Sequence, residues 1–134
     1  MDDLTFLRSR IAEYADYRNQ DARHLVDKQV RAYVGEAVAS LQERLLPTGE
    51  AGEMIEDVLM RCEFSDQRVI RATDHGSFVD DVLVNQIHEI DRALVEAADR
   101  APDIDASTLP AFAKEVCELF DRRFGTISTS VPQS

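Results

Sequence analysis

The stretch from Leu4 to Leu46 contains no proline and only one glycine, Gly35. Its apolar residues recur in steps of three and four, which is the spacing of one face of an α-helix. They are Leu4, Leu7, Ile11, Tyr14, Ala22, Leu25, Val30, Tyr33, Ala37, Leu41 and Leu45. The sequence Pro-Thr-Gly at 47–49 then stops the pattern. We therefore predict one helix over about residues 3–46, about 65 Å long at 1.5 Å per residue.

A helix of this length is longer than the rest of the chain can cover. A compact domain of 134 residues has a radius of gyration of about 14 Å. Half of the apolar stripe would then face water, and an exposed patch of that size marks a partner surface. One solution is a break near Tyr17–Asp21, where Arg18 falls on the stripe, giving a monomeric bundle. The other is a second copy that packs its own long helix there.

We favour the dimer, because the stretch Tyr17–Asp21 contains no proline, glycine or capping box, and cyclic dimers are the commonest oligomers. The interaction surface predicted on this basis is the N-terminal part of the stripe. It consists of Leu4, Leu7, Ile11, Tyr14, Arg18 and Leu25.

The rest of the chain also follows helical periodicity, and turn residues divide it. We predict helices over about 50–64, 66–75, 78–100 and 108–124, the last ended by Gly125. No stretch shows the sustained alternation of a strand. The sequence therefore predicts an all-α bundle of four to five helices in a single domain, 1–125. The Ser/Thr/Pro-rich residues 126–134 are predicted to form a disordered C-terminal tail.

The charge balance excludes some classes of partner. The chain has 15 basic and 26 acidic side chains, a net charge of −11. Binding to nucleic acid or to an anionic membrane needs cations that neutralise phosphates, so neither partner is expected. The acidity serves solubility, or it attracts a basic protein partner. No apolar run is long enough to span a membrane, and Met1–Leu4 does not resemble a secretory signal, so we expect a cytoplasmic protein.

Few residues suggest a metal site. Asp21 and His24 form an Asp-x-x-His pair, half of the pattern that binds metal in some bundles, but they fall on the predicted solvent face. His88 and Asp91 lie at the edge of the apolar stripe of the fourth predicted helix. There we expect a boundary histidine bonded to a carboxylate rather than a ligand or a base. These four residues are the weak metal candidates, and we predict no bound metal.

Other catalytic signatures are absent from the sequence. Cys62 and Cys117 are far apart and match no CxxC pattern, so we predict two buried thiols. There is no GxSxG motif and no glycine-rich phosphate loop. We therefore predict no catalytic residues and no cofactor.

Two functions follow from these observations. The first is a non-enzymatic, acidic helical interaction module, acting as a homodimeric adaptor, regulator or small chaperone. The alternative is a helical-bundle protein or enzyme that binds a metal or small ligand between helices, using His24, His88 and nearby carboxylates. A third, an acidic mimic of nucleic acid, is disfavoured because acids and arginines alternate along most helices.

Overall fold

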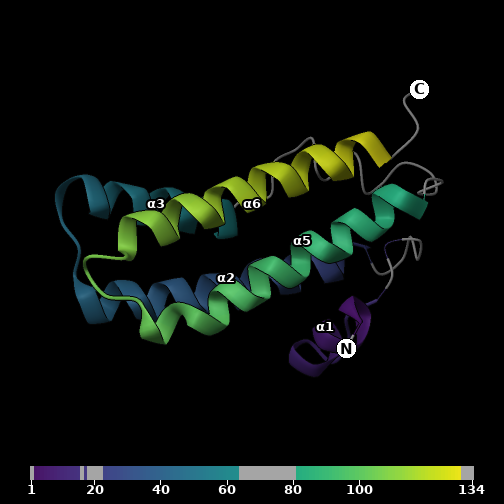
Figure 1. Cartoon of the computed structure of the whole chain (residues 1–134), viewed down its shortest axis with the longest axis horizontal. Coiled ribbons are helices and arrows are strands. Elements are labelled where there is room, and N and C mark those ends of the chain that lie inside the picture. Colours follow the sequence, from purple (N-terminus) through teal and green to yellow (C-terminus); the bar gives the residue numbers. More distant parts are fainter. Residues whose placement is uncertain (1, 16, 18–22, 64–80, 131–134) are drawn as a thin grey trace.

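The protein is a bundle of helices, seen here in a computed structural model of the chain (Figure 1). The structure describes residues 2–15, 17, 23–63 and 81–130, without the side chains of 23, 24 and 128–130. The elements are α1 (Asp3–Arg10), α2 (Arg23–Leu45), α3 (Gly49–Glu63), α5 (Asp81–Arg100), the 3₁₀ helix η2 (Ala101–Asp103) and α6 (Leu109–Ser130). None of the described residues is in a strand. The predicted all-α bundle is confirmed.

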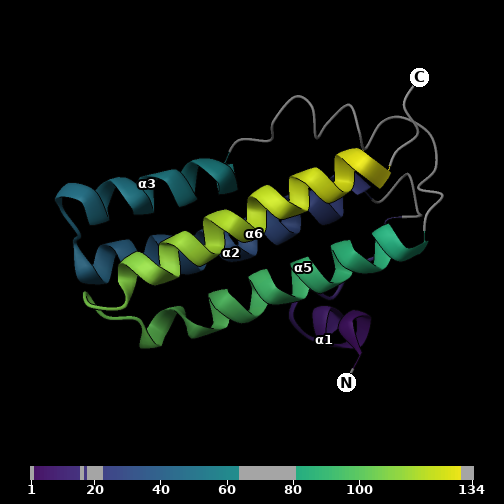
Figure 2. The same ribbon diagram turned by 45° about the horizontal axis from the view of Figure 1, so that its top comes forward.

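The four long helices form two hairpins that pack against each other. The short turn after Leu45 connects α2 to α3, and η2 leads from α5 towards α6. α5 packs against α6 and α2, while α3 also packs against α6 and α2. α1 lies outside this group and packs against α5, as the tilted view shows (Figure 2). Within the described part of the chain, no helix combines the length and the apolar composition needed to cross a membrane.

The predicted continuous helix over about residues 3–46 is wrong. α1 ends at Arg10, and Ile11 is extended, with φ −126° and ψ 94°. The backbone N–H of Tyr14 donates to the carbonyl of Ile11 at 2.9 Å, which closes a turn. The sequence indicated a candidate helix break only at Tyr17–Asp21, so the observed break begins several residues earlier than expected.

Because α1 and α2 are separate helices, the apolar stripe does not run through both in one register. The buried apolar residues of α2 are Val26, Val30, Val34, Val38 and Leu41. Leu25 is instead 47% exposed. Successive residues of a helix point in directions about 100° apart. Continuing the spacing of α1 through the break therefore assigned the wrong residues of α2 to its buried face.

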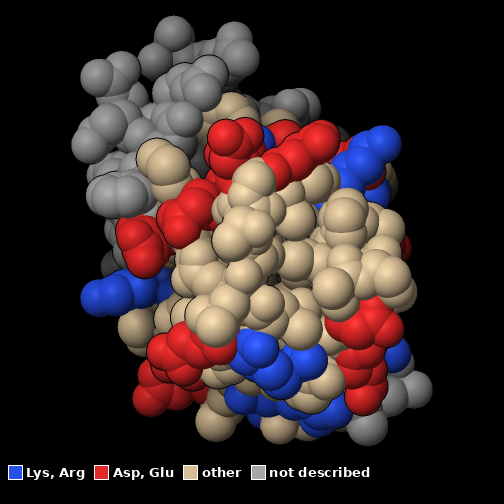
Figure 3. Space-filling view, turned by 90° about the vertical axis from the view of Figure 1, so that its left-hand side faces the viewer, with Lys and Arg blue, Asp and Glu red and all other residues tan. Residues whose placement is uncertain are grey.

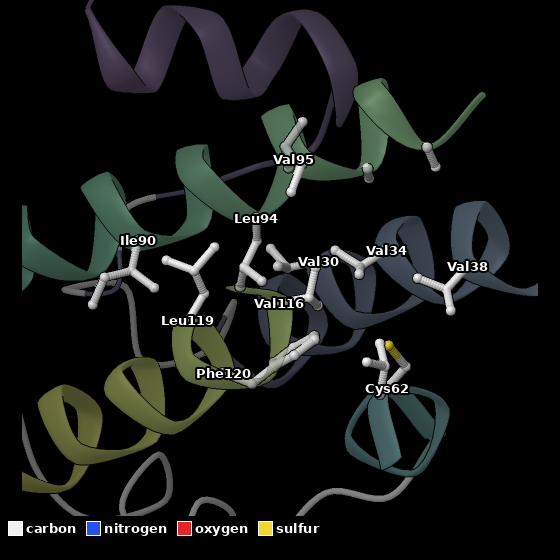
Figure 4. Close-up of a cluster of buried hydrophobic side chains, with 14 of the residues drawn as sticks. Val30, Val34, Val38, Cys62, Ile90, Leu94, Val95, Val116, Leu119 and Phe120 are labelled. Atoms are coloured by element: carbon white, nitrogen blue, oxygen red, sulfur yellow. The ribbon is translucent and has the colours of Figure 1, made fainter. Parts of the chain in front are cut away.

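Valine, leucine and phenylalanine side chains from α2, α3, α5 and α6 fill the centre of the bundle (Figure 4). The labelled members are Val30, Val34, Val38, Cys62, Ile90, Leu94, Val95, Val116, Leu119 and Phe120. Gly35 allows α3 to approach α2 closely, because a Cβ there would lie 3.2 Å from the Cβ of Cys62. Cys62 is buried, Cys117 is half-buried, and both thiols are free.

The predicted helix ends agree with the structure at some positions and not at others. α3 matches the predicted helix over 50–64 to within a residue, and α5 ends before Pro102 as expected. Gly125 does not end α6, so residues 126–130 of the predicted disordered tail are helical. Glycine costs about 1 kcal/mol inside a helix, and packing of Ile127, which is fully buried, offsets that cost. The helix predicted over 66–75 lies outside the described residues.

Candidate functional site

The residues predicted to form a dimer surface are mostly buried within their own chain. Leu7 is 0% exposed, Ile11 7% and Tyr14 2%. Leu4 is half-buried against the same core, and only Leu25 is exposed. Arg18 lies outside the described residues. The expectation of an uncovered N-terminal stripe is therefore wrong, because the chain turns after α1 and places that stripe against α5.

Two of the four weak metal candidates, His88 and Asp91, lie among the described side chains. Asp21 and the side chain of His24 lie outside the described residues. His88 and Asp91 are both buried on α5, at 4% and 0% exposure. Among the side chains that the structure describes, no group of three or more His, Cys, Asp or Glu is placed to hold a metal ion. A ligand site built on His24 and His88 stays a prediction.

Asp91 instead belongs to a buried polar cluster centred on Arg123 of α6. The Arg123 Nε donates to Asp91 Oδ1 at 2.6 Å, Nη1 to Asp27 Oδ1 at 2.5 Å and Nη2 to the Tyr17 hydroxyl at 2.6 Å. Arg31 donates to the other oxygen of Asp27 at 3.1 Å. A buried charge is costly unless it is paired and hydrogen-bonded, and each of these charges is.

Two tyrosines complete this cluster and bring in the segment after α1. The hydroxyls of Tyr14 and Tyr17 both donate to Asp91 Oδ2, at 2.7 and 2.8 Å. The ring of His88 lies 6.1 Å from the ring of Tyr14 and 6.2 Å from that of Tyr17. The cluster thus links Tyr14 and Tyr17 to α5 and α6 at the place where α2 contributes Asp27.

The protonation states of the cluster follow from burial and charge. Burial, and then the nearby Asp91 carboxylate, raises the pKa of Tyr14 and Tyr17 well above the usual value. Burial alone would raise the pKa of Asp27, but the guanidinium groups of Arg123 and Arg31 lower it below the ordinary value. Both tyrosines are therefore neutral and Asp27 is charged at neutral pH. These groups hold one another in place and are poorly suited to exchange protons with a substrate.

A second feature is the acidic surface of the α2–α3 hairpin. Between residues 36 and 63 the chain has seven acidic and two basic side chains, a net formal charge of −5. All seven acids are exposed, and none forms a salt bridge with a residue that the structure describes. We call this set the hairpin acids: Glu36, Glu43, Glu50, Glu53, Glu56, Asp57 and Glu63.

The two arginines between residues 36 and 63 bind other parts of the protein. Arg44 donates to the carbonyls of Ala101 and Ile104, at 3.0 and 2.8 Å, and so joins the α2–α3 turn to the η2 segment. Arg61 pairs with Asp121 of α6 at 3.1 Å. The hairpin acids therefore receive little neutralisation from the cations of their own helices.

The hairpin also carries a groove of about 610 Å³ at its turn. Its lining residues are Gln42, Pro47, Thr48, Gly49, Gly52, Glu53, Glu56 and Asp57. The floor is tightly packed, since a Cβ at Gly52 would lie 2.9 Å from the Pro47 carbonyl oxygen. Three of the hairpin acids thus surround a concave surface.

Leu46 immediately precedes this groove in the sequence, and it is 75% exposed. Its φ of 47° is left-handed, a conformation that usually belongs to glycine after a helix end. The end of the bundle that includes the α2–α3 turn is uncharged in its centre and bordered by separate acidic and basic groups (Figure 3). An exposed apolar side chain and several carboxylates therefore lie at the same turn.

Sequence reasoning missed four members of the buried cluster: Tyr17, Asp27, Arg31 and Arg123. One signal was present, because Arg123 falls in line with Phe112, Val116, Phe120 and Ile127, all of them buried on α6. Comparison of the chain with family models, with curated proteins and with solved structures finds no match.

Proposed function

We propose that this protein is a non-enzymatic interaction module, and that its α2–α3 hairpin binds a basic, amphipathic segment of a protein partner. The observation that carries the proposal is the set of exposed hairpin acids without salt bridges to the described residues. Complementary charge speeds the encounter of two proteins and selects between partners. A partner rich in Arg or Lys would supply the opposite charge that the hairpin itself lacks.

The helix dipole explains only part of this acidity. Glu50 lies in the first turn of α3, where the positive end of the helix favours a carboxylate. Glu53, Glu56 and Asp57 lie beyond that turn, where the effect has largely decayed. Glu53 and Asp57 are four residues apart, and like charges at that spacing destabilise a helix by about 0.2–0.5 kcal/mol. A cationic partner would remove this repulsion.

The exposed Leu46 indicates that the partner segment has an apolar side as well. An amphipathic helix recognised in a groove presents apolar anchors on one face and polar residues on the other. In this arrangement an apolar side chain covers Leu46 and Pro47, while cations on the neighbouring turn reach Glu53 and Glu56.

The test uses a synthetic helical peptide in which Leu and Lys alternate with helical spacing, labelled for fluorescence anisotropy. The triple variant Glu53→Gln, Glu56→Gln, Asp57→Asn should bind about tenfold more weakly, since each exposed pair is worth about 0.2–1 kcal/mol. Raising the salt concentration should weaken wild-type binding and reduce the difference between the two proteins.

The matched control removes the same number of charges from other exposed positions, with Glu13→Gln, Glu89→Gln and Glu118→Gln. This control should bind within about twofold of the wild type, because screening limits the effect of distant charges. Equal losses in both variants would mean that the peptide senses only net charge, and the hairpin would not be the site. Equal binding of a Leu–Glu peptide would also contradict the proposal.

A further inference from the structure

The turn after α1 opposes the local preference of its own sequence. Residues 11–15 read Ile-Ala-Glu-Tyr-Ala, and alanine and glutamate are among the strongest helix formers. The helix nevertheless ends at Ile11, without the glycine that usually ends one. Such a conflict between local preference and observed conformation means that long-range contacts hold the turn open.

Those long-range contacts are the hydrogen bonds of the turn to the bundle. Tyr14 and Tyr17 donate to Asp91 of α5. Within the N-terminal segment, the Nε of Arg8 donates to the Tyr14 carbonyl at 3.0 Å. The turn is therefore held by groups that a continuous helix would pull away from α5.

α1 itself is fixed to the protein chiefly through one neighbour, α5. Arg92 Nη1 pairs with Asp3 at 3.1 Å, and Arg10 Nε pairs with Asp99 at 3.0 Å. The Arg92 guanidinium also lies 4.7 Å from the centre of the Phe6 ring. The α5 surface that receives α1 would accept the same helix from any copy of the chain.

We propose that two copies of this chain exchange α1. In the exchanged dimer the turn at 11–15 becomes helical, and α1 of each copy packs on α5 of the other. Exchange of an identical element forms a dimer at low cost, because the contacts of α1 with α5 are kept. The helical preference of the turn offsets the loss of the tyrosine–Asp91 bonds and of the burial of Ile11 and the two tyrosine rings, and this balance sets the fraction of dimer. The partner here is a second copy, so this inference does not depend on the basic partner proposed above.

The first test weakens the contacts that hold the turn. The double variant Tyr14→Phe, Tyr17→Phe removes both hydroxyls that bind Asp91, and with them the bond from Arg123 to Tyr17. It should raise the dimer association constant roughly tenfold or more in sedimentation equilibrium. Tyr33→Phe is the matched control, because its hydroxyl donates at 2.6 Å to Asp99, the partner of Arg10 on α5, and monomer and exchanged dimer both keep that contact. It should leave the association constant unchanged.

The second test identifies which helix is exchanged. One chain carries Asp3→Arg and Arg10→Asp, and the other carries Arg92→Asp and Asp99→Arg. Each chain alone has mismatched charges between α1 and α5. In the exchanged heterodimer, α1 of the first chain meets α5 of the second with both charge pairs reversed. α1 of the second chain meets α5 of the first with both natural pairs, so all pairs are of opposite charge. The two chains refolded together should therefore form a heterodimer, whereas each chain alone keeps mismatched α1–α5 contacts in monomer and homodimer alike and gains nothing from exchange.

A third variant acts in the opposite direction. Ala12 is exposed, and Ala12→Gly disfavours helix at the turn, so it should lower the dimer fraction several-fold. The circular dichroism of every variant should retain a folded helical spectrum. The proposal is overturned if the tyrosine double variant stays as monomeric as Tyr33→Phe, or if the charge-reversed chains do not associate when refolded together.

Discussion

The two halves of α2 share one stripe of buried valines, but they differ in where their charged side chains lie. The first half contributes Asp27 and Arg31 to the buried cluster around Arg123. The second half contributes Val34 and Val38 to the apolar core, and its acids point outward. In the buried cluster the carboxylates of Asp27 and Asp91 are matched by Arg123 and the part-buried Arg31, whereas between residues 36 and 63 the acids outnumber the cations.

This difference separates what folding requires from what it does not. A buried charge must be paired, since desolvation would otherwise make the folded state unfavourable. An exposed carboxylate is hydrated and needs no partner in the same chain. The excess of acids on the hairpin is therefore not required by the fold, and it is the part of the charge pattern most available to an external partner.

The largest expected effect on stability comes from removing Arg123, the centre of the buried cluster. Arg123→Met leaves Asp27 and Asp91 buried without their shared cation. The free energy of unfolding should fall by about 3–5 kcal/mol, the usual cost of an uncompensated buried charge. Urea unfolding followed by circular dichroism at neutral pH measures the loss, and the exposed Arg100→Met, whose partner Glu115 is hydrated, serves as the control.

Replacing the two carboxylates left without Arg123 by amides should restore part of the lost free energy of unfolding. The triple variant Arg123→Met, Asp27→Asn, Asp91→Asn should be more stable than Arg123→Met alone, since replacing a whole ion network costs less than removing one member. If Arg123→Met costs no more than Arg100→Met, the cluster is hydrated in solution and the contrast between the two halves of α2 is lost.

The next effect in size is the acid dependence of stability. Burial would raise the pKa of Asp27, but Arg123 and Arg31 lower it below the ordinary value. A lowered pKa contributes stability that is present above the unfolded-state pKa of about 3.9 and is lost as the pH falls through the folded-state pKa. Urea midpoints measured at decreasing pH below about 4 should therefore fall more steeply for the wild type than for Asp27→Asn. Parallel curves would show that the pair does not hold Asp27 ionised.

The helical architecture was largely readable from local sequence, but its first break was not. Proline and glycine positions gave the limits of α3 and the end of α5 to within a residue or two. The turn at Ile11 has no such marker, because its cause is a carboxylate on α5 that is 77 residues from Tyr14 in the sequence. The periodicity of the local sequence carries no information about a contact at that separation. The prediction therefore treated two helices as one.

The two features of the candidate site also differ in how far the sequence predicts them. The excess of acids over residues 36–63 is visible in the sequence, since exposure needs no particular partner. The buried cluster is not, because an arginine on the apolar face of α6 predicts that buried acids exist without saying which helices supply them. Asp27 and Asp91 are separated from Arg123 by 96 and 32 residues, and only the packing of α2, α5 and α6 brings them together.

The smallest effect concerns the apolar residue at the hairpin turn, and it sharpens the distinction between folding and binding. Leu46 is exposed and left-handed, so Leu46→Gly should raise the free energy of unfolding by about 0.5–1 kcal/mol through relief of backbone strain. The same change removes the proposed apolar anchor, and the affinity for the Leu–Lys peptide should fall several-fold. Leu46→Asn, which tolerates the left-handed conformation but is polar, should also weaken binding. A gain in stability with unchanged peptide affinity would remove Leu46 from the proposed site and leave the hairpin acids as its only determinant.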